Sequence, residues 1–178
     1  MPQEYTRQSM ILAEVNALAL EQFVARFGSV FEHSPWVAEG AWGRRPFRDA
    51  AHLHAELCTV MRAASGERQL ALIQAHPDLA GRLELQSKLT VESTREQASA
   101  GLNALSVEEL AEFQRLNTAY RARFGFPFII CARLNAKDAI IAAMKERTRN
   151  SPEQEFSAAL GEIEKIAKLR LDDVLKTI

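Results

Sequence analysis

Helical periodicity is the feature that most restricts what this chain can fold into. Between residues 107 and 124, apolar side chains recur every three or four positions, at Leu110, Phe113, Leu116, Tyr120 and Phe124. This spacing places them along one side of an α-helix, where they face a core. Ser106 and Glu109 have the spacing of a capping box that begins such a helix, and Gly125 is a natural end.

Similar patterns predict helices along the rest of the chain, at residues 16–27, 49–64, 67–75, 91–101 and 136–147, and from Pro152 onward. Ser151 and Gln154 make a second capping box in front of the last of these. Residues 128–132 have a strand-like composition but no partner strand, so we expect a buried, extended connection there. The fold class is therefore all-α, a single-domain bundle of about seven to eight helices over residues 1–178.

Charge and cysteine content exclude several classes of function. The chain carries 22 Lys and Arg against 23 Asp and Glu, a net charge of −1, which argues against nucleic-acid binding and polybasic membrane attachment. Cys58 and Cys131 fit neither a disulfide framework nor paired metal ligands. None of the 8 glycines falls in a phosphate-binding pattern. We therefore expect no metal site, no nucleic-acid partner and a small-molecule ligand, if any.

No stretch of the sequence predicts insertion into a membrane or export. The longest nearly apolar run, residues 126–132, is far below the ~20 residues that span a bilayer. The N-terminus lacks the apolar core of a signal peptide. The sequence ends Lys176-Thr177-Ile178, which differs from the Ser-Lys-Leu peroxisomal signal. These features predict a cytoplasmic protein.

His76 is the histidine with the best position for chemistry. It lies at a predicted helix end and is followed by Pro77, Asp78 and Gly81. The residue before a proline avoids the helical region, so His76 has a stiff, non-helical backbone that can aim it into a cavity. Its unperturbed pKa near ~6.5 suits proton transfer at neutral pH. The alternative is that His76 only caps the C-terminus of a helix.

Two other polar positions each allow a structural and a functional interpretation. Ser93 and Glu96 have capping-box spacing, and spacing alone favours that structural role. Arg133 follows an apolar run, from which its guanidinium can bind a substrate carboxylate through two hydrogen bonds. It can equally pair within the protein, with Asp138 or Glu146.

Five motifs in order resemble one family, the 2-oxo-4-hydroxy-4-carboxy-5-ureidoimidazoline (OHCU) decarboxylases of urate breakdown. They are Glu-His-Ser-Pro-Trp at 32–36, Arg-Pro-Phe at 45–47, His-Pro-Asp-Leu-Ala-Gly at 76–81, Ser-Thr-Arg-Glu-Gln at 93–97 with Ala-Gly-Leu at 100–102, and Phe-Gly-Phe-Pro-Phe-Ile-Ile-Cys-Ala-Arg at 124–133. The resemblance covers roughly residues 10 to 175. It implies an all-helical domain that makes (S)-allantoin.

The resemblance also implies roles for particular residues. His76 and Glu96 match the family's catalytic pair, and Arg133 is carried over as a contact to the substrate carboxylate or carbonyl. The implied substrate-binding residues are Pro77, Ser93, Thr94, Arg95, Gln97, Phe128, Ile129, Ile130, Cys131 and Ala132. No cofactor is expected, because the ring of OHCU can itself accept the electron pair that decarboxylation leaves.

The sequence alone does not exclude two other functions, and it does not decide whether the protein is a homodimer. A non-catalytic helical interaction module would expose an apolar groove and would not gather His76, Glu96 and Arg133 on one cavity. A hydrolase acting on a ureide ring would use His76 or Glu96 to activate water. A homodimer is common among all-α enzymes of this size, and the sequence does not decide it.

Overall fold

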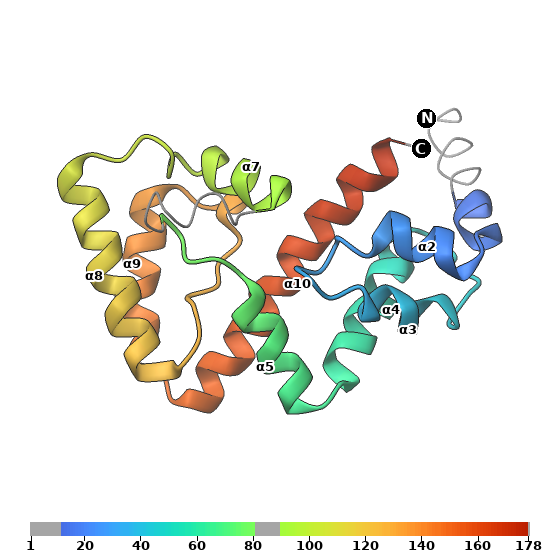
Figure 1. Cartoon of the computed structure of the whole chain (residues 1–178), viewed down its shortest axis with the longest axis horizontal. Coiled ribbons are helices and arrows are strands. Elements are labelled where there is room, and N and C mark those ends of the chain that lie inside the picture. Colours follow the sequence, from blue (N-terminus) through green and yellow to red (C-terminus); the bar gives the residue numbers. More distant parts are fainter. Residues whose placement is uncertain (1–11, 81–89, 178) are drawn as a thin grey trace. The chain divides into compact units, whose positions relative to one another are not determined.

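The computed structural model describes residues 12–80 and 90–177, so Gly81 and Ile178 lie outside the described part. Within it the chain forms helices and connections and no strand, which confirms the all-α prediction. Contacts divide the chain into two compact units, residues 1–72 with 167–178, and residues 73–166. The helices α5 (Gly66–Ala75) and α10 (Pro152–Lys176) contribute residues to both units (Figure 1). The single domain expected over residues 1–178 stays a prediction beside this division.

The first unit includes the helices α2 (Leu20–Phe27), α3 (Trp36–Trp42) and α4 (Ala50–Ala63). The helix α3 packs against both α2 and α4. The carboxylate of Asp49 accepts the N–H of His52 at 2.7 Å and caps α4, which confirms the helix predicted at 49–64. Buried apolar side chains from all three helices make the core of this unit: Phe23, Phe27, Val37, Leu53, Leu57 and Met61.

One predicted helix of the first unit is wrong in its extent. The prediction placed a single helix at 16–27, but the helix at 12–17 ends before Leu18, and α2 begins at Leu20. The Leu18 carbonyl accepts hydrogen bonds from Trp42 Nε1 at 3.0 Å and Arg45 Nη1 at 2.9 Å. These donors come from a distant part of the sequence and replace the helical partner of that carbonyl. The short helix α3 was not predicted at all.

The second unit contains α7 (Val91–Ser99), α8 (Val107–Phe124), the 3-10 turn η1 (Ala132–Leu134) and α9 (Lys137–Arg147). The predicted capping box of α8 is present, with the Ser106 hydroxyl accepting the Glu109 N–H and the Glu109 carboxylate accepting the Ser106 N–H. Gly125 ends α8 in the left-handed conformation, at φ 78°. In the described part of the chain, no helix is both long and apolar enough to cross a membrane.

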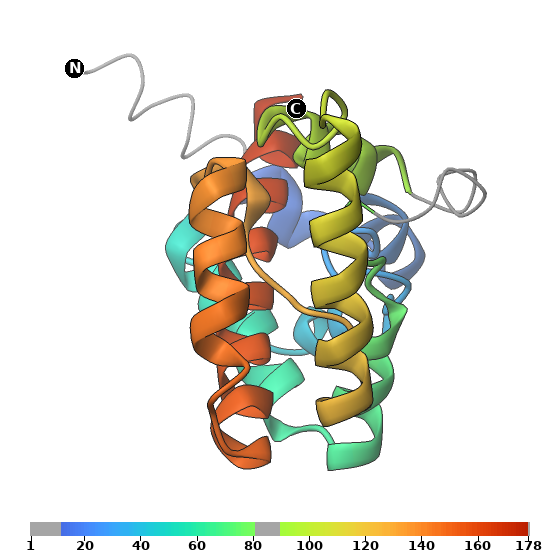
Figure 2. The same cartoon turned by 90° about the vertical axis from the view of Figure 1, so that its left-hand side faces the viewer.

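An extended segment, residues 126–131, links α8 to α9 (Figure 2). The two helices lie side by side and run in the same direction, so the chain returns along their length before α9 begins. Every residue of the segment is buried. The prediction of a buried, extended connection is therefore confirmed, with the difference that a 3-10 turn starts at Ala132. Residues of this segment form one wall of a cavity.

Candidate active site

A half-open cavity lies within the unit formed by residues 73–166. The space between its walls is about 360 Å³, which includes a part open to solvent. Its walls come from the loop after α5, from α7, from the extended segment and from α10. The lining residues are His76, Pro77, Leu79, Ser93, Glu96, Gln97, Phe128, Ile129, Ile130, Ala132 and Ile166.

His76 enters the cavity from the first residue beyond α5. The helix ends at Ala75, and the His76 N–H still bonds the Ile73 carbonyl at 3.2 Å before Pro77 turns the chain away. The residue is buried, at 6% exposure. Burial and the non-helical backbone before Pro77 limit the orientations that the imidazole can adopt, as the sequence predicts.

The loop that follows His76 is held by both neighbouring helices. From α8, Asn117 Nδ2 donates to the Leu79 carbonyl at 2.8 Å, and Arg121 Nε bonds the Asp78 carboxylate at 2.9 Å. From α7, the Gln97 side chain accepts the Ala80 N–H at 3.1 Å. Gln97 thus both lines the cavity and fixes the loop, so it contributes to the position of His76 as well as to the wall.

Glu96 projects from α7, and the structure corrects the capping interpretation of its motif. The N-cap of α7 is Thr90, whose hydroxyl accepts the Ser93 N–H at 3.2 Å. Ser93 is therefore inside the helix, and Ser93 with Glu96 is not a capping box. Ser93, Glu96 and Gln97 are three and four positions apart, on one face of the helix, and all three line the cavity.

Two residues of the same motif lie on the other side of α7. Thr94 and Arg95 are exposed and do not line the cavity. The Thr94 hydroxyl donates to the Thr90 carbonyl at 3.0 Å, within the helix itself. The resemblance implies that all of residues 93–97 line the substrate site. In the helix, however, these residues are divided between a face toward the cavity and a face toward solvent. A contact of Thr94 or Arg95 with substrate stays a prediction.

The extended segment contributes an apolar wall. Phe128, Ile129, Ile130 and Ala132 line the cavity, and Cys131 does not. The Cys131 N–H instead donates to Glu162 Oε2 of α10 at 2.9 Å. Burial raises the pKa of the Cys131 thiol above its usual range, and the carboxylates of Glu162 and Glu96 raise it further. The thiol is thus protonated at neutral pH, whereas a nucleophilic cysteine needs a lowered pKa and a populated thiolate.

Arg133 is placed differently from the other predicted catalytic residues. It lies in η1, directly after the wall residue Ala132, and it is exposed and absent from the cavity lining. The structure thus brings His76 and Glu96 together with residues 128–132 and does not bring Arg133 into the same lining. Its contact with substrate stays a prediction.

The cavity combines a few polar groups with a mostly apolar surface. An imidazole, a carboxylate, a hydroxyl and an amide, from His76, Glu96, Ser93 and Gln97, face side chains such as Phe128 and Ile130. This is the composition of a site that orients a small polar substrate and exchanges protons with it. Across residues 12–80 and 90–177, no three His, Cys, Asp or Glu side chains cluster as metal ligands would.

Sequence reasoning missed two lining residues, Leu79 and Ile166. Leu79 belongs to the motif that follows His76, so its position in the wall is a local consequence of that loop. Ile166 comes from α10, far along the chain from every motif. It lies in the helix predicted from Pro152 onward, but nothing in the sequence indicates that it faces this cavity.

Comparisons with known proteins agree on one family. A family model described as OHCU decarboxylase matches residues 16–172. A 2-oxo-4-hydroxy-4-carboxy-5-ureidoimidazoline decarboxylase from Amia calva is 42% identical over 167 residues, covering 94% of this chain and 95% of the relative. One from Haloferax volcanii is 46% identical over 162 residues, covering 91% and 94%.

Solved structures give the same picture for the fold. The crystal structure of an (S)-allantoin synthase is similar with a TM-score of 0.72 and 29% identity, covering 92% of this chain and 53% of that one. An OHCU decarboxylase crystallised with (S)-allantoin has a TM-score of 0.68 at 24% identity, covering 89% and 99%. At that identity the second comparison supports the fold alone.

Proposed function

The chain belongs to the OHCU decarboxylase family, and from this membership we propose that it converts OHCU to (S)-allantoin in urate breakdown. The observation that carries the proposal is the meeting of His76 and Glu96 on one cavity with the wall formed by residues 128–132. An interaction module has no need to gather polar groups from separate motifs around a half-open cavity. The cavity therefore favours an enzyme.

The chemistry requires little from the protein. Loss of CO2 leaves an electron pair on the ring carbon that carried both the carboxylate and the hydroxyl. In OHCU that carbon adjoins the ring C=N bond, so the pair delocalises through this bond, and with the hydroxyl proton passed to the ring nitrogen the intermediate is an enolate. The substrate thus performs the task for which other decarboxylases use a cofactor. The protein has to orient the carboxylate, stabilise the enolate oxygen and deliver one proton to one face of the neighbouring ring carbon, which bears the ureido group.

We assign the proton transfer to His76 and the orientation of the substrate to Glu96. An imidazole is the side chain whose pKa best matches proton exchange near neutral pH. The Glu96 carboxylate is an acceptor for the substrate hydroxyl or a ring N–H. Delivery from one fixed group to one face accounts for a single enantiomer, whereas spontaneous decarboxylation gives racemic allantoin.

The extended segment is the proposed source of enolate stabilisation. Main-chain N–H groups in a non-helical wall can be directed at a developing negative charge. The Cys131 N–H is already used by Glu162, so the assignment falls on the preceding residues of the wall, with Ile130 first. The apolar side chains of Phe128 and Ile130 lower the solvation of the substrate carboxylate, which favours loss of CO2.

The decisive experiment generates OHCU freshly from urate and follows the optical activity of the allantoin formed. We expect rapid appearance of dextrorotatory (S)-allantoin with release of one CO2 per substrate. A rate equal to the spontaneous background would refute the proposed function. Ring opening without CO2 release would identify a ureide hydrolase instead.

The remaining expectations concern partners and location. The net charge of −1 supports a small-molecule substrate rather than a nucleic acid. A homodimer is tested by light scattering coupled to size exclusion, where twice the 19.9 kDa chain mass is the expected result. A cytoplasmic location is tested by cell fractionation.

A further inference from the structure

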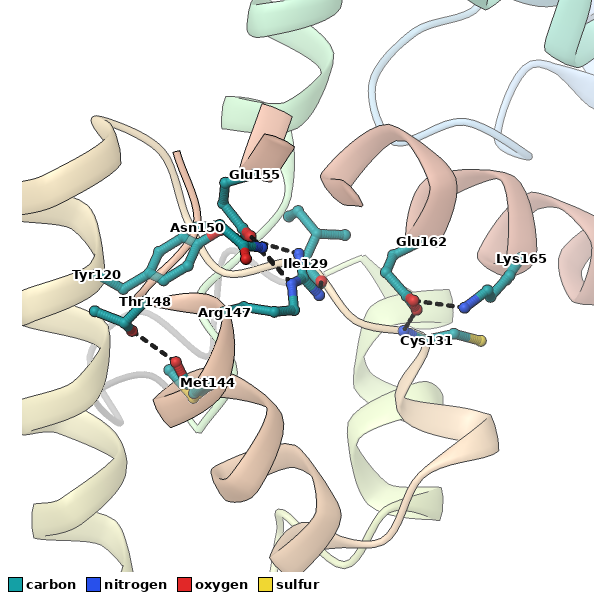
Figure 3. Close-up of polar contacts among 10 residues, drawn as sticks. All are labelled: Tyr120, Ile129, Cys131, Met144, Arg147, Thr148, Asn150, Glu155, Glu162 and Lys165. Atoms are coloured by element: carbon teal, nitrogen blue, oxygen red, sulfur yellow. Dashed lines mark hydrogen bonds and ion pairs between the residues drawn. The ribbon is translucent and has the colours of Figure 1, made fainter. Parts of the chain in front are cut away.

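The cavity wall formed by residues 128–132 is anchored from outside the cavity at two main-chain atoms. The Ile129 carbonyl accepts a hydrogen bond from Arg147 Nη1 at 2.7 Å. The Cys131 N–H donates to Glu162 Oε2 at 2.9 Å. Figure 3 shows the two anchors on either side of the segment, with Arg147 at the end of α9 and Glu162 on α10. Neither Arg147 nor Glu162 lines the cavity.

The two anchors control the peptide groups on either side of Ile130. A trans peptide group holds its C=O and N–H in opposite directions, and among the described residues only the Arg45–Pro46 bond is cis. With the Ile129 carbonyl turned to Arg147, the Ile130 N–H of the same group points away from Arg147. With the Cys131 N–H turned to Glu162, the Ile130 carbonyl points away from Glu162. The anchors therefore decide which main-chain groups of Ile130 are available on the cavity side.

The Arg147 anchor is itself fixed by a buried cluster. Its Nη2 lies 2.6 Å from Glu155 Oε1, and the Glu155 side chain is fully buried. Glu155 also accepts hydrogen bonds from the Tyr120 hydroxyl and from Asn150 Nδ2, the latter at 2.7 Å. The Arg147 guanidinium lies 4.5 Å from the centre of the Phe128 ring, which is part of the cavity wall. A planar guanidinium can hold a carboxylate, a carbonyl and a ring at once, and an ammonium cannot.

The Glu162 anchor is simpler and less buried. Its other oxygen, Oε1, accepts from Lys165 Nζ at 2.6 Å, and the Lys165 side chain is 55% exposed. Oε2 is left for the Cys131 N–H. An ion pair with so exposed a lysine contributes little, so the useful contact of Glu162 is the one to the wall.

We propose that Glu162 and Arg147 are positioning residues for decarboxylation, which act by fixing the peptide groups around Ile130 that face the substrate. The inference rests on the proposed function, because it concerns the same cavity. The buried ion pair of Arg147 with Glu155 is a poor source of net stability compared with apolar packing. Because Arg147 also bonds the cavity wall, we assign the pair a different role, the orientation of main-chain donors and acceptors.

The test compares Glu162→Leu with Glu162→Gln, measuring kcat, KM and the enantiomeric purity of the allantoin. Leucine removes the acceptor, so we expect kcat to fall about 10- to 100-fold with a smaller change in KM, since a displaced donor acts on the transition state. Glutamine keeps an acceptor oxygen for the Cys131 N–H and should recover most of the lost kcat. Lys165→Ala removes only the exposed partner of Glu162 and serves as the matched control, with kcat unchanged.

A second variant keeps the test decisive if Glu162→Leu folds poorly. Arg147→Lys retains the charge opposite Glu155 but cannot bond the Ile129 carbonyl at the same time, so kcat should also fall. Because both anchors act on one segment, the effects of Arg147→Lys and Glu162→Leu on kcat should be non-additive. Thermal unfolding of each variant ensures that only folded protein is compared.

Two results would overturn the inference. One is a folded Glu162→Leu protein with wild-type kcat and a single enantiomer as product. The other is a Glu162→Gln protein as impaired as Glu162→Leu, because the anchor would then not be acting as a hydrogen-bond acceptor. Failure of the proposed function is a different result, a wild-type protein that does not accelerate OHCU decarboxylation at all.

Discussion

Arg121 Nε lies 2.9 Å and 3.0 Å from the two carboxylate oxygens of Asp78, which follows His76 and Pro77 in the chain. Both side chains are partly exposed, at 43% and 21%, so the pair contributes at most about 1 kcal/mol to stability. Its effect on activity should be larger than its effect on stability, because it fixes the loop that carries His76. We expect Arg121→Ala to lower kcat several-fold with an unfolding free energy within about 1 kcal/mol of wild type.

The control for this pair is the double variant. If Arg121 acts on His76 only through Asp78, then Asp78→Ala combined with Arg121→Ala should be no worse than either change alone. Additive losses in kcat would show that the two residues act independently and would contradict the loop-fixing role. Chemical denaturation and the rate of (S)-allantoin formation are the two measurements.

Replacement of His76 tests the proposed proton transfer directly. His76→Gln keeps a hydrogen-bonding side chain of similar size but cannot exchange a proton at neutral pH, so turnover should fall roughly 10²–10⁴-fold. The matched control is His54→Gln on α4, where the imidazole contacts Cys58 Sγ at 3.3 Å and does not line the cavity. Near-normal production of (S)-allantoin by His76→Gln would refute the assignment.

A catalytic role of Glu96 can be tested independently of the capping of its helix. Because Thr90 is the N-cap of α7, Glu96→Gln should leave the unfolding free energy within about 1 kcal/mol while removing most activity. Thr90→Ala is the complementary change and should cost about 1 kcal/mol of stability. The two variants are compared by urea unfolding and by the rate of CO2 release. Full activity in Glu96→Gln would remove the carboxylate from the mechanism.

Local signals allowed some of the helix ends to be predicted from sequence to the residue. Ser106 and Gly125 bound α8, and Ser151 precedes α10, because capping and left-handed glycine act within one turn of the chain. The break before α2 was missed because its cause, the bonding of the Leu18 carbonyl by Trp42 and Arg45, is distant in sequence. No local pattern encodes such a contact.

The candidate site shows the same division between local and distant causes. The face of α7 that carries Ser93, Glu96 and Gln97 follows from helical geometry once the N-cap is known to be Thr90 rather than Ser93. Choosing between the two caps needed the structure, because both residues can cap a helix. The anchors Arg147 and Glu162 were not predicted, because they bond main-chain atoms of a segment whose side chains carry no sign of them.

The thiol of Cys131 should be much less reactive than that of Cys58. Burial raises its pKa above the usual range, so the thiolate is scarce in the folded protein. The unfolded chain loses this proton at a lower pH than the folded protein does. The free energy of unfolding that depends on this thiol is therefore fully present below the ordinary pKa of ~8.5, and it is lost as the pH rises toward the pKa of the thiol in the folded protein. Alkylation followed by mass spectrometry should label Cys58 first at pH 8. Equal labelling of the two thiols in folded protein would contradict this prediction.

Tyr120 provides the last test, of the buried cluster behind the cavity wall. Its hydroxyl donates to Glu155, and burial followed by that carboxylate raises the pKa of the phenol well above its usual range. Tyr120→Phe removes a hydrogen bond to a charged group and should cost about 2 kcal/mol at pH 7. The phenol of the folded protein keeps its proton where the unfolded chain begins to lose it, near pH ~10. The stability difference between wild type and Tyr120→Phe should therefore shrink as the pH rises above about 10, measured by urea unfolding at a series of pH values. A difference independent of pH would mean that the phenol proton is not held by Glu155.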